Sequence, residues 1–214
     1  HDLIAGSRVE RLAAPRPMVR RVPRPAPAEP APVPVGSSPS TILAALGDER
    51  ARRQLSALAA DGATARGWLA PEDDRWAEAV SERARRAAVA LADRPALATE
   101  VDLQQALQAA GLLFDAGLHF EVHEVLEPHW AAARGDTREM LQGLIQIAVG
   151  YQHLANGNHA GARSLLVEGS GRLHQRRLAG VDLDPFARAA AIAAERLMAG
   201  EPVAVPSFPR FSTG

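Results

Sequence analysis

The residues best suited to chemistry lie close together in the second half of the chain. Six of the seven histidines fall between positions 119 and 174, and His123 is followed by Glu124 and Glu127. Imidazole nitrogens and carboxylate oxygens are donor atoms that bind divalent metals in proteins. A glutamate beside such a metal can act as general base on the water that the metal binds. This stretch therefore predicts either a metal centre or a hydrogen-bonded polar network.

The spacing around His123 predicts an α-helix over about 118–130. At about 100° per residue, His123 and Glu127 lie one turn apart on the apolar side of this helix, whereas Glu121 and Glu124 lie opposite. The apolar side should face the core, so we expect His123 and Glu127 inside the fold and Glu121 and Glu124 in water. A buried carboxylate must be hydrogen-bonded, paired or bound to a metal, which makes the buried polar groups informative.

A metal site on this helix would need a further ligand from another helix. The next predicted helix has one polar stripe, which consists of Gln142, Gln146 and His153. We therefore expect a site in which His123 and Glu127 meet that stripe, with His123, Glu127 and His153 as the metal ligands. The candidate ligand-binding residues are Trp130, Gln142, Gln146 and His153, although Trp130 is also suited to anchoring the core. The alternative is a satisfied core network that fixes helix register without chemistry.

Composition excludes several classes of protein. The chain has 24 cations, all arginine, against 25 anions, so no strong overall field recruits nucleic acid or an anionic membrane. Cysteine is absent, which excludes a disulfide framework and a thiolate zinc site and fits a reducing cytoplasm. No run of eighteen apolar residues predicts a membrane-spanning helix, and no basic-then-apolar signal segment is visible. The arginine, alanine and proline content is typical of a high-G+C bacterial genome.

Helix start and stop signals predict an all-α fold. We expect two short helices from about residue 40 to 60, and a longer one from Pro71 to about Ala92, because proline and acids favour a helix start. The later helices are expected at about 101–116, 118–130, 137–155, 159–174 and 185–199. No segment alternates with period two for long enough to predict a strand.

Two similar turns predict antiparallel helical hairpins. Gly117 and Gly157 lie forty residues apart in similar surroundings, and each would end one helix just before the next begins. This is the logic of tetratricopeptide-like hairpins, although the repeat there is 34 residues long. Gly143 and Gly150 would let a neighbouring helix approach closely. We expect a compact bundle of such hairpins.

The predicted organisation has four parts. Residues 1–39 carry nine prolines and six arginines and are expected to form a disordered tail. Residues 40–98 form an accessory helical segment, and residues 99–205 form the bundle. Residues 206–214 are expected to be a second tail.

Three ordered motifs carry a family resemblance over roughly residues 105–175. The first consists of Phe120, Glu121, His123, Glu124, Glu127 and Trp130. The second consists of Gln142, Gly143, Leu144, Ile145, Gln146 and Ala148, and the third of Gly157, Asn158, Gly161, Ala162, Leu165 and Leu166. The chain thereby resembles the domain of unknown function 309 family. The resemblance implies a compact helical bundle whose activity is unassigned. Because its first motif includes Glu121 and Glu124, either a kink at Pro128 re-aims these two residues or they face a second helix or a subunit. Glu121, His123, Glu124 and Glu127 therefore all stay candidate catalytic residues.

Three functions are compatible with these observations. The first is a helical binding or scaffold module whose His/Glu/Gln cluster holds structure or a ligand. Its partner would be another protein or a second copy of the chain. The second is a metal-assisted hydrolase-like enzyme, in which His123 and a glutamate hold a divalent ion and a second glutamate is the general base. The third is a nucleic-acid-associated protein that docks through the arginine-rich tail, an option that the balanced charge disfavours.

Overall fold

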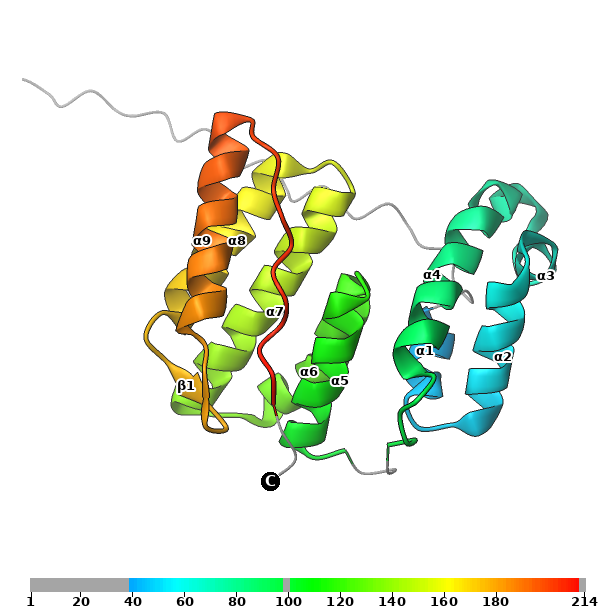
Figure 1. Ribbon diagram of the computed structural model, residues 1–214, viewed down its shortest axis with the longest axis horizontal. Helices are drawn as coiled ribbons and strands as arrows, with labels where there is room; N and C mark the ends of the chain where they lie inside the picture. The colour runs from blue at the N-terminus through cyan, green and yellow to red at the C-terminus, as the bar shows by residue number, and fades with distance from the viewer. Residues whose placement is uncertain (1–38, 98–100, 212–214) are drawn as a thin grey trace, which may run out of the picture.

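The computed structural model describes residues 39–97 and 101–211, which form two groups of helices joined by one connection (Figure 1). The all-α prediction is confirmed: within these residues the only strands are two of two residues each. The predicted N-terminal tail, with its expected docking role, lies almost entirely outside the described residues. No helix of the described part is long and apolar enough to cross a membrane.

The N-terminal lobe, which we define as residues 39–97, contains the accessory helices. They are α1 (Pro39–Ala45), α2 (Glu49–Ala60), α3 (Gly62–Arg66), the 3-10 helix η1 (Pro71–Trp76) and α4 (Ala77–Leu91). The side chain of Asp48 accepts a hydrogen bond from the Arg50 amide at 2.7 Å, as expected for a residue that caps α2. The start predicted at Pro71 is confirmed, but its first turn is 3-10 before α4 begins.

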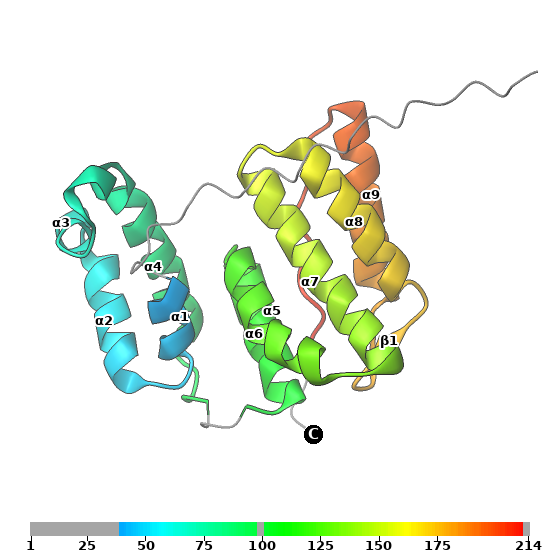
Figure 2. The ribbon, with the colours of Figure 1, turned by 180° about the vertical axis from the view of Figure 1, so that it is seen from behind.

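The bundle, residues 101–211, holds the five longer helices predicted from the sequence. They are α5 (Leu103–Asp115), α6 (His119–Ala132), α7 (Gly135–Ala155), α8 (His159–Leu173) and α9 (Asp184–Ala199). Seen from behind, α7 and α8 lie side by side, with α9 beyond α8 (Figure 2). Their buried faces are lined by leucine, alanine and aromatic side chains that form one continuous core with the N-terminal lobe.

The two similar turns have the predicted structure. Gly117 and Gly157 adopt positive φ angles of 71° and 74°, which favour glycine. The amide of Leu118 donates to the carbonyl of Leu113 at 2.8 Å, and the amide of Asn158 donates to that of His153 at 2.9 Å. This is the hydrogen bond of a Schellman motif, and it ends α5 and α7 in the same way. The α5–α6 and α7–α8 hairpins are therefore closed by equivalent turns.

Close approach between α7 and α8 depends on small residues, as predicted. A Cβ atom added to Gly143 would lie 2.7 Å from Leu173 Cδ2, and one added to Gly150 would lie 3.1 Å from Leu166. Gly169 on α8 lies against the backbone of Gly143. A Cβ atom added to Gly169 would lie 2.8 Å from the carbonyl oxygen of Gly143. The glycine of the second motif therefore has a packing role.

Three features differ from the sequence predictions. Helix α3 follows the predicted stop at once, because the Asp61 side chain accepts a hydrogen bond from the Thr64 amide at 2.6 Å and caps a new turn. The expectation of no strand was wrong at one hairpin, where β1 (Arg177–Leu178) pairs with β2 (Val181–Asp182). Strands of two residues are too short to show an alternation of apolar and polar positions.

The third difference is the C-terminal segment 201–211, which we call the strap. It has no helix or strand, but it runs along the bundle (Figure 1), with Phe208 1% and Phe211 7% exposed. The Phe208 amide donates to Asp115 Oδ1 at 2.9 Å. The expected tail from residue 206 is thus part of the packed bundle as far as residue 211.

Candidate functional site

Helix α6, which carries the first motif, is covered on more than one side. It packs against α5 and α7 within the bundle and against α1 of the N-terminal lobe. A surface helix buries only its apolar face, whereas a helix with neighbours on several sides also buries residues on its other faces. The residues of α6 that become buried are His119, Glu121, Val122 and Leu126.

Glu121 faces another helix, α4, and not water as the helical wheel predicted. Its side chain is 0% exposed, and Oε1 accepts a hydrogen bond from Arg83 Nη2 on α4 at 2.5 Å. A buried carboxylate needs such a partner, because its transfer out of water is costly. The other oxygen, Oε2, has no hydrogen-bond partner among the described residues. Glu121 therefore ties the bundle to the N-terminal lobe.

His119 also lies in the core, where it is 5% exposed. Its ring packs against Phe114 with centroids 4.9 Å apart and lies 5.9 Å from the ring of Tyr151. Neither ring nitrogen has a hydrogen-bond partner among the described residues. Burial, together with the positive charges of Arg86 and Arg83, lowers the pKa of His119 to about 4. Burial likewise raises the pKa of the Tyr151 hydroxyl.

His123, Glu124 and Glu127 form a cluster on the outer side of α6, which we call the α6 triad. His123 Nδ1 lies 2.9 Å from Glu124 Oε1, and one donor atom of each residue lies within 4.8 Å of the others. His123 and Glu124 are half-buried, whereas Glu127 is exposed. The predicted burial of Glu127 was therefore wrong. His123 and Glu127 are neighbours, as expected. The third potential ligand is Glu124 of the same helix, whereas a residue from another helix was predicted.

The polar residues of α7 are not assembled around the triad. Gln146 donates to Glu168 at 3.0 Å and accepts from Arg172 at 3.0 Å, so its amide bridges α7 to α8. His153 Nδ1 lies 3.0 Å from the amide nitrogen of Asn158, whose oxygen caps α8. Gln142 is half-buried on α7. Within residues 39–97 and 101–211, the group of potential metal ligands excludes His153.

Trp130 is half-buried and packs against the core, as expected for an anchor. The guanidinium carbon of Arg138 lies 3.9 Å from the centre of its ring, a cation–π contact. The same arginine donates to the Trp130 carbonyl at 2.7 Å. Together these contacts join the end of α6 to α7. Pro128 does not end the helix, which continues to Ala132.

A cavity of about 680 Å³ adjoins the triad between α1 and α6. Glu124 lines it together with Pro128 and His129 on α6, and the opposite wall includes Leu46 and Leu97 of the N-terminal lobe. Because Pro128 has no amide hydrogen, the Glu124 carbonyl lacks its usual helical donor. The triad thus stands at the edge of a space in which a ligand could contact Glu124.

Comparison with known families supports the resemblance drawn from the motifs. Residues 107–165 match the family model of a domain of unknown function (DUF309). The chain resembles that family. The match covers α5 from Leu107, all of α6 and α7, and the start of α8. No curated protein matches the chain, and no solved structure does.

The structure gives packing or capping roles to several of the motif residues. Gly143, Gly157, Asn158 and Leu166 shape the hairpins, Glu121 pairs with Arg83, and Trp130 stacks with Arg138. Among the described residues, the polar and aromatic contacts of the α6 triad stay on α6: His123 meets Glu124 at 2.9 Å, and its ring lies 6.4 Å from that of Phe120. Arg83 was not predicted as a partner, because Arg83, Arg85 and Arg86 together are typical of a solvated helix face. Only its i, i+3 register with the buried Val80 could have hinted otherwise.

Proposed function

We propose that this chain is a helical module that binds one divalent transition-metal ion at the α6 triad. The observation that carries the proposal is the meeting of one imidazole and two carboxylates on adjacent turns of one helix, with donor atoms within 4.8 Å of one another. One nitrogen and two oxygen donors suit zinc, manganese, iron or nickel.

The distances require a small adjustment of the side chains. Donor atoms about 2.1 Å from a tetrahedral ion are about 3.4 Å apart, so the widest separation in the triad must shorten. Glu127 is exposed and has no partner among the described residues, and its rotation would close the gap. Three protein donors leave at least one coordination position for water or a ligand, as in catalytic rather than structural metal sites.

The decisive experiment is metal binding by untagged protein. After chelator treatment and dialysis, the protein is titrated with Zn²⁺ and with Mn²⁺, and bound metal is measured by elemental analysis. We expect about one equivalent in the wild type, and loss of at least tenfold in affinity in His123→Ala. His159→Ala is the matched control, because His159 is an exposed histidine at the start of α8 and should leave binding unchanged.

Stability provides a second readout. A ligand at about 100 times its Kd stabilises the folded state by about 2.7 kcal/mol, so saturating metal should raise the Tm of the wild type and the control. His123→Ala should remain folded without this rise. Equal binding by His123→Ala and wild type, or no binding of any of these metals, would show that the triad is a surface network.

Metal-assisted hydrolysis is a second candidate, favoured by the position of Glu124. This carboxylate lines the 680 Å³ cavity while it also contacts His123. With His123 and Glu127 on the ion, Glu124 would act as general base on a bound water. Glu124→Gln should then keep most of the metal affinity but abolish hydrolysis in a screen of ester, amide and phosphoester substrates. Hydrolysis that persists in Glu124→Gln at the wild-type rate would remove Glu124 from this role.

A further inference from the structure

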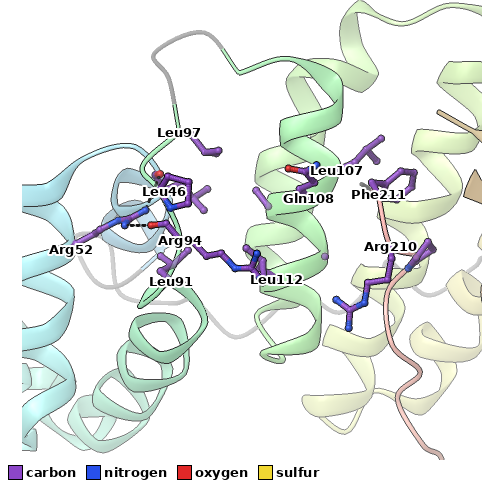
Figure 3. A pocket seen from close by; sticks show the side chains of 14 residues that line it. Leu46, Arg52, Leu91, Arg94, Leu97, Leu107, Gln108, Leu112, Arg210 and Phe211 are labelled. Atoms are coloured by element: carbon purple, nitrogen blue, oxygen red, sulfur yellow. Dashed lines mark hydrogen bonds between the residues drawn. The ribbon is translucent and has the colours of Figure 1, made fainter. Parts of the chain in front are cut away.

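A second cavity lies between the lobes, away from the triad, at the end of α4 (Figure 3). Its volume is about 480 Å³, within the range of small-molecule sites. Its lining comes from the turn after α1, from α2, from the end of α4 and the segment after it, from α5 and from the strap. It shares two wall residues, Leu46 and Leu97, with the cavity beside the triad.

The walls of this interlobe cavity are mostly apolar. The large apolar side chains that line it are Leu46, Leu91, Leu97, Leu107, Leu112 and Phe211. Leu107 is fully buried, and Phe211 is 7% exposed, so these two form its fixed inner surface. Such a surface favours the apolar part of a ligand by about 25 cal/mol per Å² of area removed from water.

The charged groups of the cavity have one sign. The lining includes Arg52, Arg94 and Arg210, and no aspartate or glutamate among the described residues. Glu49 and Asp115, which do not line the cavity, offset the charges of Arg52 and Arg210, so the unpaired positive charge is that of Arg94.

Two of the three arginines already have partners. Arg52 donates from Nε to the Ala45 carbonyl at 2.9 Å and from Nη1 to the Arg94 carbonyl at 2.6 Å, and its Nη1 also lies 3.7 Å from Glu49 Oε1. Arg210 Nη2 pairs with Asp115 Oδ2 at 2.8 Å. These contacts hold the cavity walls in place.

Arg94 is different, because its guanidinium has no partner within residues 39–97 and 101–211. Its side chain extends from the end of α4 toward Leu112 on α5 (Figure 3). The planar guanidinium offers two parallel N–H donors, the arrangement that matches a carboxylate. Arg94 is an exposed residue, so its guanidinium is reachable from solvent as well as from the apolar walls. A charged group beside apolar walls can orient a ligand in a small-molecule site.

We propose that the interlobe cavity binds an organic monocarboxylate with an apolar body, with its carboxylate on Arg94 and its body against Leu107, Leu112 and Phe211. The apolar walls disfavour a small inorganic anion, which would gain little there, and the unpaired cation disfavours a neutral hydrocarbon. The site does not depend on the α6 triad, so a metal-free protein should bind the acid equally well.

The test compares octanoate with octan-1-ol by calorimetry and by NMR chemical shifts, in buffer that contains a chelator. We expect octanoate to bind the wild type at least tenfold more tightly than octan-1-ol. Each methylene added from hexanoate to octanoate should improve affinity about fourfold, from about 0.8 kcal/mol per buried CH₂. Chemical shift changes should centre on α5, the end of α4 and the strap.

Two variants locate the site. Arg94→Gln should weaken octanoate at least tenfold and leave octan-1-ol unchanged, and it keeps the backbone carbonyl that accepts from Arg52. Arg53→Gln is the matched control on the exposed face of α2. Leu112→Trp should fill the cavity and weaken both probes. The proposal is overturned if acid and alcohol bind equally, if Arg94→Gln binds octanoate like the control, or if no binding is detected.

Discussion

The buried imidazole of His119 makes the stability of this protein sensitive to mild acid. The ring is 5% exposed and has no hydrogen-bond partner among the described residues that could stabilise its charged form. Arg86 and Arg83 oppose its protonation further. In the unfolded chain His119 is free of these constraints and takes up a proton near its ordinary pKa.

The magnitude follows from the two pKa values. The pKa falls from 6.5 to about 4 on folding, and each unit corresponds to about 1.4 kcal/mol, which gives about 3 kcal/mol. Above pH 6.5 both states are neutral at this residue, so the effect is absent. As the pH falls toward 4, the unfolded state binds the proton first, and the free energy of unfolding decreases. Below about pH 4 the loss is complete.

The assay is urea unfolding at a series of pH values for the wild type and His119→Phe. Other groups titrate in both proteins, so the difference between the two curves isolates His119. We expect the variant to gain about 3 kcal/mol relative to wild type between pH 7 and pH 4, and the His119 ring to remain neutral at pH 5.5 by NMR. A constant difference across this range, or a His119 ring that protonates near pH 6.5, would refute the reasoning.

Two further predictions concern packing and the contact between the lobes. Gly143→Ala should destabilise the fold by about 1–3 kcal/mol in urea unfolding, because its Cβ would lie 2.7 Å from Leu173. Gly171→Ala, on the same pair of helices but with open space around it, should be neutral or stabilising by up to about 1 kcal/mol; equal effects would contradict the close-packing argument. Arg83→Met should cost about 3 kcal/mol because it leaves Glu121 buried without its partner. Adding Glu121→Gln should recover part of that loss, and strictly additive costs would count against a coupled pair.

Local signals were sufficient to predict most of the fold. Aspartate and asparagine caps, proline at first turns and glycine at helix ends place the helix boundaries within a few residues. The strap could not be predicted, because residues 201–211 have no helical or strand period. The position of the strap depends on the burial of Phe208 and Phe211 against the bundle, and that surface exists only after the helices have packed.

The candidate site was predicted less accurately than the fold. The sequence located His123 and Glu127 as neighbours, since i, i+4 spacing alone brings them together. It placed Glu121 in water because a helical wheel assumes one buried face. The burial of Glu121 depends on α4, a helix from a distant part of the chain, which no local pattern encodes.

The Arg83–Glu121 pair also restricts how the two lobes can move. It is a buried contact between α4 and α6, whereas the two cavities between the lobes are partly open. Separating α4 from α6 would leave the Glu121 carboxylate buried without its partner, so this pair favours one arrangement of the two lobes. Both cavities share Leu46 and Leu97 as walls, so the position of these two leucines sets the shape of both spaces at once.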